Sequence, residues 1–293
     1  AVHINAFNFP IWGMLEKIAV NLMAGVAAVV KPSEYTSYLT ELMVKEIIDS
    51  KILPEGSLQL IPGSGKGILD HVGHNDVVTF TGSASTGKTL KSHPYILKNS
   101  VPFNMEADSL NACVLGEDVE ESSDEFDIFI KEIYREMTAK TGQKCTAIRR
   151  ILVPENKIDQ VQKALITKLE KTIIGNPENK DVKMGALASK VQVERVQKNV
   201  ELLMESQEKV FDNSQKLNLV DASLEKGAFF SPVLFRNDEP FLKDAVHNIE
   251  AFGPVSTLIP YKNMAEAVEL VEMGKGSLGT SLGWISNFCS STT

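Results

Sequence analysis

Short apolar segments alternate with amphipathic helical segments through roughly the first third of this chain. Residues 26–30, 58–61 and 77–81 favour strands, because each is a brief apolar run bounded by polar residues, glycine or proline. Residues 11–23 and 38–50 carry apolar side chains at helical spacing. Strands that are separated by helices of this length indicate βαβ units, right-handed crossovers and a parallel sheet.

The pattern of predicted strands and helices changes after Asp108, where the predicted helices become longer. Helices are predicted at residues 126–140, 157–172, 189–206 and 264–273, and strands at residues 150–153, 229–235 and 255–260. The polar stretch 211–225 is typical of a surface loop or hairpin. We therefore expect two α/β domains, residues 1–108 and residues 109–293.

Strand-like segments lie at both ends of the chain, at residues 1–7 and 279–286. A compact domain rarely begins and ends on core strands, because chain ends are usually exposed and poorly ordered. We therefore expect an internal piece of a longer chain, in which both domains are incomplete.

Composition and charge disfavour several classes of protein. The net charge of −8 disfavours nucleic-acid binding, which needs a basic face. The most apolar run, residues 18–30, is interrupted by Asn21 and Gly25 and is too short to cross a bilayer. An odd number of cysteines without CxxC spacing favours a reducing cytoplasm over disulfides or a metal site. Cys113 and Cys289 are interpreted as small apolar residues in or near strands.

Cys145 lies in a short polar turn, residues 142–148, that follows a long helical pattern. Lys144, Arg149 and Arg150 would supply positive charge beside it, and such charge favours a reactive thiolate. The turn does not establish a nucleophile by itself, since a lone cysteine is more often a small buried apolar residue.

Two glycine-bearing turns follow predicted strands. Residues 80–87, Phe-Thr-Gly-Ser-Ala-Ser-Thr-Gly, open a helix, so their free backbone N–H groups can bind a pyrophosphate. They do not form the GxGxxG pattern of the usual dinucleotide fingerprint. Residues 63–67 are equally consistent with a tight connection. From the residues alone, these turns are either part of a nucleotide site or tight connections between elements.

Six motifs together resemble the NAD(P)-dependent aldehyde dehydrogenases, in order and in spacing over the whole chain. They are residues 5–10 (Asn-Ala-Phe-Asn-Phe-Pro), 31–34 (Lys-Pro-Ser-Glu), 80–87, 105–106 (Met-Glu), 142–145 (Gly-Gln-Lys-Cys) and 250–254 (Glu-Ala-Phe-Gly-Pro). The resemblance implies the α/β fold of that family. In this fold a parallel, Rossmann-like cofactor domain is followed by an α/β catalytic domain.

The resemblance implies a chemical role for three residues. Cys145, as a thiolate, would attack the aldehyde carbonyl and form a thiohemiacetal. The side-chain amide of Asn8 and the backbone N–H of Cys145 would stabilise the oxyanion. Hydride transfer would leave a thioester, and Glu106 would activate the water that hydrolyses it.

The resemblance also implies a site for NAD or NADP and no metal. The residues assigned to the cofactor are Lys31, Ser33, Glu34, Gly82, Ser83, Gly87, Glu250 and Phe252. Lys31 and Glu34 would reach the adenine ribose, and Ser83 the pyrophosphate. Glu250 would hold the nicotinamide ribose, with Phe252 beside it. Because a carboxylate at position 34 repels a 2′-phosphate, we expect NAD to be used at least as well as NADP.

One departure narrows the resemblance to a branch of the family. Residues 106–111 are Glu-Ala-Asp-Ser-Leu-Asn where the family usually has Glu-Leu-Gly-Gly. This variant is similar to the dehydrogenase modules of bacterial phenylacetate degradation. The branch implies oxidation of a CoA-linked semialdehyde by a parent protein that forms a homo-oligomer.

Other functions stay open at the level of sequence. A CoA-acylating relative would lack the water-activating carboxylate, whereas Glu106 is present. A cysteine hydrolase would need a histidine base in a turn-rich motif, and no such motif is evident. An inactive, structural relative would be expected to have lost Cys145 or Glu106. A hydrolytic aldehyde dehydrogenase that acts on another aldehyde is the remaining alternative.

Overall fold

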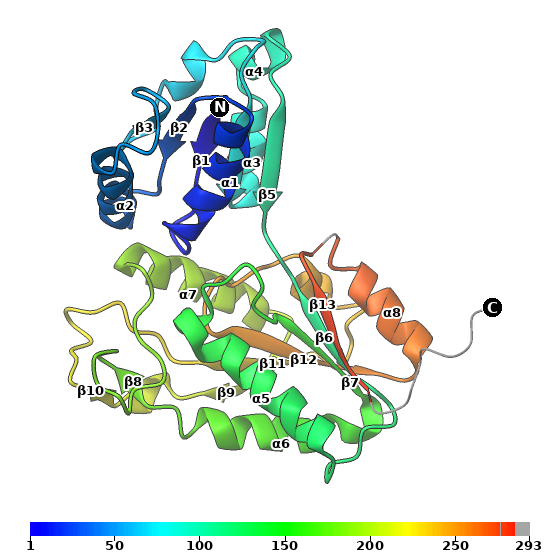
Figure 1. Cartoon of the computed structure of the whole chain (residues 1–293). Helices are drawn as coiled ribbons and strands as arrows, with labels where there is room; N and C mark the ends of the chain where they lie inside the picture. Colours follow the sequence, from blue (N-terminus) through cyan, green and yellow to red (C-terminus); the bar gives the residue numbers. More distant parts are fainter. Residues whose placement is uncertain (276, 285–293) are drawn as a thin grey trace. The chain divides into compact units, whose positions relative to one another are not determined.

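A computed structural model describes residues 1–275 and 277–284 of the chain. The chain divides into two compact units, Ala1–Asp108 and Ser109–Thr293. The elements of each unit are labelled in Figure 1.

The first unit is built on a five-stranded sheet in the order β3-β2-β1-β4-β5. All neighbouring strands in it are parallel, as the alternating pattern predicted. Its strands are β1 (Val2–Ile4), β2 (Ala28–Lys31), β3 (Leu58–Leu60), β4 (Val78–Gly82) and β5 (Phe103–Ala107). Its helices are α1 (Trp12–Met23), α2 (Ser37–Asp49), α3 (Ala84–Lys91) and α4 (Pro94–Lys98), with a 3₁₀ turn at Ile68–His71.

Successive side chains of a strand point to opposite faces of a sheet, and β2 shows how both faces are covered. Ala28 and Val30 lie in one apolar core together with Met14 of α1. Val29, between them, packs against a second core that contains Ile96 of α4. Helices therefore cover both faces, which is what βαβ units require.

The second unit contains a six-stranded sheet in the order β13-β6-β7-β12-β11-β9. Strands β11 and β9 pair antiparallel, and the other neighbours are parallel. The strands are β6 (Ala112–Leu115), β7 (Arg150–Pro154), β9 (Glu208–Asp212), β11 (Val233–Arg236), β12 (Val255–Tyr261) and β13 (Thr280–Gly283), and β8 (Ile174–Gly175) pairs separately with β10 (Leu219–Val220). The helices are α5 (Asp124–Thr138), α6 (Ile158–Leu169), α7 (Lys190–Met204) and α8 (Met264–Glu272).

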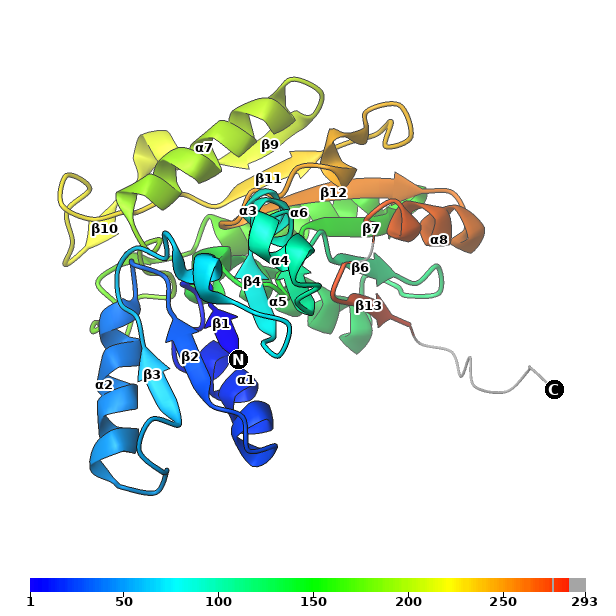
Figure 2. The same cartoon turned by 90° about the horizontal axis from the view of Figure 1, so that it is seen from above.

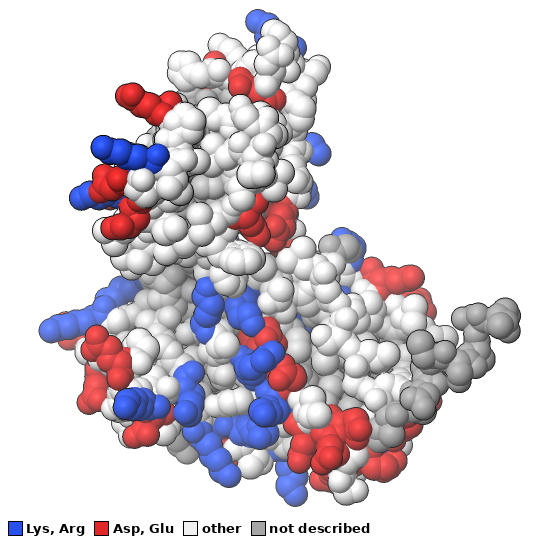
Figure 3. Space-filling view, viewed as in Figure 1, with Lys and Arg blue, Asp and Glu red and all other residues white. Residues whose placement is uncertain are grey.

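Helix α5 leads into the Cys145 turn, and local residues specify where it starts. The side chain of Ser123 accepts a hydrogen bond from the backbone N–H of Phe126 at 3.2 Å. Acidic residues fill the first turn, and Figure 3 shows acidic side chains gathered at this end of the helix. Negative charge there stabilises a helix N-terminus. The apolar stripe that includes Phe129 and Ile133 then packs with α6 against the sheet.

The opposite face of the second sheet is covered by α7 and α8. Val200 of α7 packs with Phe235 of β11, and Figure 2 shows α7 lying along β9 and β11. Leu270 of α8 packs with Ile259 of β12. The second sheet therefore also has helices on both faces.

Some predicted elements differ from the observed ones. Within the predicted polar loop 211–225, β9 pairs antiparallel with β11 and β10 pairs parallel with β8, so the backbone described there forms no hairpin. The strand predicted at residues 1–7 is shorter, since β1 covers only three residues. Strand β13 lies within the strand predicted at 279–286. Residues 285–293, which include Cys289, are outside the described part of the chain.

Candidate active site

The predicted site residues of the first unit follow the carboxyl ends of four neighbouring strands. Asn8 follows β1, Lys31 ends β2 and Ser83 follows β4. Glu106 lies near the end of β5, paired in register with Thr81 of β4. Open parallel sheets bind ligands outside this edge. The fold of the first unit thus places four motifs, scattered in sequence, at one edge of its sheet.

The loop that carries Asn8 is held from helix α2. Thr36 Oγ1 donates a hydrogen bond to the carbonyl of Phe7 at 3.0 Å, and Thr40 Oγ1 donates one to the carbonyl of Pro10 at 3.1 Å. The backbone is therefore fixed on both sides of Asn8, whose side chain is half-buried.

Lys31 is buried, whereas Glu34 is exposed. The Lys31 stem packs against Gly65, where an added Cβ would lie 3.1 Å from Lys31 Cε. Its ammonium donates to the carbonyl of Pro32 at 2.6 Å. Burial lowers the pKa of Lys31, and the Glu34 carboxylate opposes that shift. At the end of β2 the chain thus presents the Lys31 ammonium and, beyond Ser33, the exposed carboxylate of Glu34. Together these two groups suit the hydroxyls of a ribose.

Helix α3 begins immediately after β4, and Ser83 is its N-cap. The Ser83 hydroxyl accepts from the N–H of Thr86 at 3.4 Å. The N–H of Ala84 donates to Asp108 Oδ1 at 2.9 Å, so a carboxylate of the chain already engages this helix end. Gly87 has a packing role, because an added Cβ would lie 2.4 Å from Met105 Sδ.

Gly82 also has a packing role, because an added Cβ would lie 2.6 Å from the ring of Phe80. Gly82 thus leaves room for the Phe80 ring of its own strand, and Gly87 lets α3 pack closely on side chains of β5 and β4. The N–H groups of the helix end suit an anion such as a pyrophosphate, provided that Asp108 releases the N–H of Ala84.

Lys17 of α1 is a functional group that the sequence analysis missed. Its ammonium donates to Asn5 Oδ1 at 3.0 Å and to Thr81 Oγ1 at 2.6 Å. Burial lowers the pKa of Lys17, and the carboxylates of Glu16 and Glu106 oppose that shift. A lysine within the otherwise apolar first helical segment was the available signal. Lys17 and Glu106 therefore interact electrostatically within the first unit.

The predicted site residues of the second unit precede parallel strands and so gather at the amino edge of its sheet. Cys145 lies in the loop before β7, and Glu250 lies in the loop before β12. Arg150 of β7 pairs in register with Thr257 of β12 and with Ala112 of β6. The loops that enter these three neighbouring strands therefore lie side by side.

The Cys145 turn has an unusual backbone that packs against the Glu250 loop. Lys140, Thr141 and Gly142 all have positive φ, at 52°, 53° and 68°. An added Cβ on Gly142 would lie 2.2 Å from the carbonyl oxygen of Gly253, so only glycine fits. Gln143 Nε2 also donates to the carbonyl of Phe252 at 3.3 Å. The Gly-Gln-Lys-Cys and Glu-Ala-Phe-Gly-Pro motifs are thus in direct contact.

Asn111 holds the Cys145 turn from the loop before β6. Its side-chain amide donates to the carbonyl of Cys145 at 2.8 Å and to that of Ala147 at 3.1 Å. Its Oδ1 accepts from the Ser109 hydroxyl at 2.7 Å and from the N–H of Gly279 at 2.9 Å. The sequence analysis noted this segment as a departure from the family motif but gave Asn111 no role.

The expected source of positive charge beside Cys145 is only partly correct. Lys144 Nζ lies 2.7 and 2.8 Å from the two carboxylate oxygens of Glu136, which balance its charge. Arg150 turns away and donates to the carbonyls of Leu110 and Leu270.

Lys140 and Arg149 both interact electrostatically with the Cys145 thiolate. Burial lowers the pKa of both cations, and the thiolate opposes that shift. Cys145 itself is half-buried.

Glu250 is fixed by its neighbours at the same edge. Its Oε2 accepts from the N–H of Ser109 at 3.1 Å, and its Oε1 lies 3.5 Å from Arg149 Nε. Its carbonyl accepts from Asn199 Nδ2 at 2.7 Å. The Arg149 guanidinium lies over the ring of Phe252, 5.4 Å from its centroid. A carboxylate oriented in this way beside an aromatic ring suits a ribose and a flat base.

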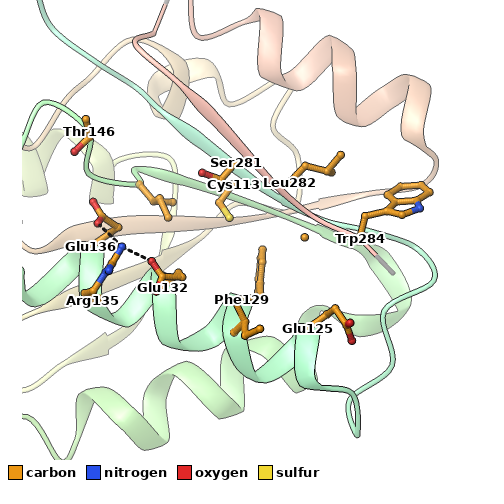
Figure 4. Close-up of a pocket in the computed structure, with 13 residues that line it drawn as sticks. Cys113, Glu125, Phe129, Glu132, Arg135, Glu136, Thr146, Ser281, Leu282 and Trp284 are labelled. Carbon is orange, nitrogen blue, oxygen red and sulfur yellow. Dashed lines mark ion pairs between the residues drawn. The ribbon is translucent and has the colours of Figure 1, made fainter. Parts of the chain in front are cut away.

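Cys113 lies in the wall of a cavity of about 440 Å³ between α5 and β13, shown in Figure 4. Burial raises the pKa of Cys113 to about 12, so this thiol is unreactive. Trp284 and Glu136 also line the cavity. The described residues contain no cluster of three or more His, Cys, Asp or Glu placed to hold a metal ion. In the same part of the chain, no helix is long and apolar enough to cross a membrane.

Residues 1–282 match the model of the aldehyde dehydrogenase family. The chain belongs to this family. A relative from Aromatoleum evansii, a 3,4-dehydroadipyl-CoA semialdehyde dehydrogenase, is 43% identical over 282 residues, which are 96% of this chain and 55% of the relative. The chain thus spans about half the length of the curated relatives that it matches.

Solved structures of the family share the fold. Betaine aldehyde dehydrogenase from Staphylococcus aureus in complex with NAD⁺ has a TM-score of 0.81 and 27% identity, over 93% of this chain and 52% of that one. An NAD-dependent aldehyde dehydrogenase from Sinorhizobium meliloti has a TM-score of 0.84 and 25% identity, over 98% of this chain and 55% of that one. The expected fold class is confirmed: it is the α/β fold of the aldehyde dehydrogenases, with a parallel sheet in the first unit.

Proposed function

We propose that this chain carries the nucleophile, the general base and most cofactor-binding residues of an NAD(P)-dependent aldehyde dehydrogenase. The observation that carries the proposal is the contact between the Cys145 turn and the Glu250 loop, where Gly142 packs on Gly253. This contact joins a partly exposed thiol to a carboxylate suited to a ribose, although the two motifs are far apart in sequence. A nucleophile and a cofactor must meet in this way for hydride transfer to follow covalent attack.

Cys145 begins the proposed reaction. Its thiolate attacks the aldehyde carbon and forms a thiohemiacetal, and the oxyanion is stabilised by the N–H of Cys145 and the amide of Asn8. Asn111 holds the Cys145 carbonyl and so orients the turn. The nicotinamide, when bound, accepts the hydride. The thiohemiacetal thereby becomes a thioester on Cys145.

Glu106 completes the proposed reaction by removing a proton from the water that attacks the thioester. The Lys17 ammonium, which interacts electrostatically with Glu106, supplies positive charge on this side of the proposed base. Hydrolysis releases the carboxylic acid and regenerates the Cys145 thiol. The presence of this base favours hydrolysis over transfer of the acyl group to CoA.

Residues of both units are proposed to bind the cofactor. In the first unit, Lys31, Ser33 and Glu34 would hold the adenine ribose, and the N-terminal end of α3, with Gly82, Ser83 and Gly87, would hold the pyrophosphate. In the second unit, Glu250 and Phe252 would hold the nicotinamide riboside. The solved relative from Staphylococcus aureus is a complex with NAD⁺, which supports this class of cofactor.

The proposed substrate is a CoA-linked semialdehyde of aromatic-acid degradation, of the phenylacetate type. The support is the 43% identity to a CoA-semialdehyde dehydrogenase over nearly the whole chain. The Glu-Ala-Asp-Ser-Leu-Asn segment, whose Asn111 anchors the nucleophile turn, supports the same branch.

The test uses the full-length protein, a panel of free and CoA-linked aldehydes, and NAD(P)H absorbance as the readout. Cys145→Ala is expected to abolish oxidation while leaving equilibrium binding of NAD⁺ intact. Cys113→Ala is the matched control, because this thiol is buried and lies outside the proposed site, and it is expected to stay active. Substantial turnover by Cys145→Ala would refute the assigned nucleophile. Oxidation of free aldehydes alone would refute the CoA-linked substrate.

A further inference from the structure

Arg149 is a buried cation that contacts both proposed halves of the site in the second unit. Its Nη2 donates to the carbonyl of Gly142 at 2.8 Å, within the nucleophile turn. Its Nη1 donates to the carbonyl of Gly253 at 2.6 Å, within the Glu250 loop. Its Nε faces the Glu250 carboxylate at 3.5 Å. Only 5% of the side chain is exposed.

We propose that Arg149 is a positioning residue that couples the Cys145 nucleophile to the cofactor-binding carboxylate of Glu250. This inference rests on the proposed function. A guanidinium offers five donors in a rigid plane, so it can hold two carbonyls and a carboxylate at once. An ammonium is a point charge that cannot span the same three acceptors. The side chain that fits this position is therefore arginine rather than any cation.

The contact with Glu250 gives Arg149 influence over the cofactor. One oxygen of the Glu250 carboxylate faces Arg149, and the other accepts from the N–H of Ser109. These two neighbours hold the plane of the carboxylate. Oε1 is buried, so a ribose hydroxyl would be bound at Oε2, which keeps a lone pair besides the one used by Ser109. Loss of the guanidinium would release both the carboxylate and the Phe252 ring that lies beneath it.

The charge of Arg149 also acts on Cys145. Among the described residues of the second unit, the charged groups around this turn besides Arg149 are Lys140, Lys144, Glu136, Glu250 and Arg135. Lys144 pairs with Glu136, whose Oε1 also lies 3.7 Å from Arg135 Nη2, and Glu250 faces Arg149. Removal of the guanidinium would take away the positive charge that faces Glu250, and the turn would become more negative. The thiolate would then form at higher pH.

Arg150 provides a matched control. It is adjacent in sequence and equally buried, and it also donates to backbone carbonyls, those of Leu110 and Leu270. It bonds neither the nucleophile turn nor the Glu250 loop, among its described contacts. Loss of either arginine should lower the melting temperature, but only loss of Arg149 removes direct contacts with the nucleophile turn and the Glu250 loop.

The experiment compares Arg149→Met, Arg149→Lys and Arg150→Met in the full-length protein. Two readouts independent of turnover are used: the dissociation constant of NAD⁺ by calorimetry, and the pH midpoint of iodoacetamide alkylation at Cys145. Both Arg149 variants are expected to weaken NAD⁺ binding about tenfold or more. Arg149→Met should also raise the alkylation midpoint, whereas Arg149→Lys should keep it near the wild-type value. Arg150→Met should change both readouts less than twofold.

Several outcomes would overturn the inference. If both Arg149 variants only melt earlier, with unchanged NAD⁺ affinity, the residue is merely structural. Equal effects of Arg149→Met and Arg150→Met on the two readouts would lead to the same conclusion. If Arg149→Met does not fold, Arg149→Lys still decides through its NAD⁺ affinity. A wild-type protein that binds neither NAD⁺ nor NADP⁺ would refute the proposed function itself, and this inference with it.

Discussion

The side-chain amide of Asn111 donates a hydrogen bond to the backbone carbonyl of Cys145 at 2.8 Å. The same amide donates to the carbonyl of Ala147, so one buried residue holds the turn on both sides of Thr146. The thiol of Cys145 therefore depends for its direction on a loop that enters a neighbouring strand, 34 residues earlier in the chain.

We expect Asn111→Ala to lower kcat at least tenfold, because the nucleophile turn loses both hydrogen bonds that it receives from Asn111. It should also lower the free energy of unfolding by about 1–3 kcal/mol, since buried carbonyls lose their donor. The control is Asn237→Ala, which removes another buried amide that donates to the carbonyl of Lys243 at 2.8 Å, outside the proposed site. Urea unfolding should show a similar decrease in the free energy of unfolding for both variants. An equal loss of kcat in the control would show that Asn111 acts only through stability.

Glu106→Gln should separate the two halves of the proposed reaction. An amide cannot remove a proton from water, so the thioester on Cys145 should persist after one hydride transfer. Stopped-flow absorbance should show a burst of about one NAD(P)H per site, followed by turnover slowed roughly 10²–10⁴-fold. Glu41→Gln on the exposed surface of α2 is the control. Steady turnover at the wild-type rate would exclude Glu106 as the base.

Glu34 should bias the choice of cofactor towards NAD. Its exposed carboxylate can accept hydrogen bonds from ribose hydroxyls but meets like charge in a 2′-phosphate. At about 5 Å and an effective dielectric constant near 20, that repulsion amounts to roughly 3 kcal/mol before the side chain moves away. Glu34→Thr is therefore expected to raise kcat/KM for NADP relative to NAD. A strong preference for NADP in the wild type, unchanged in the variant, would show that Glu34 does not face the ribose.

His247 should make the second unit sensitive to acid. Burial, together with the neighbouring Arg150 guanidinium, lowers the pKa of His247 to about 4, from an ordinary value of 6.5. Between these two pH values the unfolded chain binds a proton that the folded chain does not bind. The free energy of unfolding contributed by this group therefore falls as the pH decreases, by about 2 kcal/mol from pH 7 to pH 5.

The variant His247→Gln tests this dependence, because an amide oxygen can still accept from Arg150 but does not titrate. Urea unfolding at pH 7 and at pH 5 should show that the free energy of unfolding falls less in the variant than in the wild type. His74→Gln, at an exposed position, should retain the full loss. Identical losses in wild type and His247→Gln would show that another group carries the acid sensitivity.

The elements and the motifs could be predicted from local sequence, because both depend on residues that are near neighbours in the chain. Apolar spacing placed α1 and α2 to within about a residue of their observed ends. The alternation of strands and helices predicted that the strands of the first sheet are parallel, but not their order. The Gly-Gln-Lys-Cys motif likewise marked Cys145 as the candidate nucleophile. Apolar spacing can be recognised in a sequence because it repeats at the period of a helix or a strand.

The ion pairs around Cys145 could not be predicted from the sequence and are known from the folded structure alone. Three cations beside Cys145 looked alike in sequence, yet Lys144 pairs with Glu136, Arg150 turns towards α8, and Arg149 faces Glu250. Each of these outcomes depends on the direction of a long side chain and on a partner brought close by the sheet. The direction of a side chain and the identity of its partner are not encoded in local spacing. Both are set by how the loops at one sheet edge pack together.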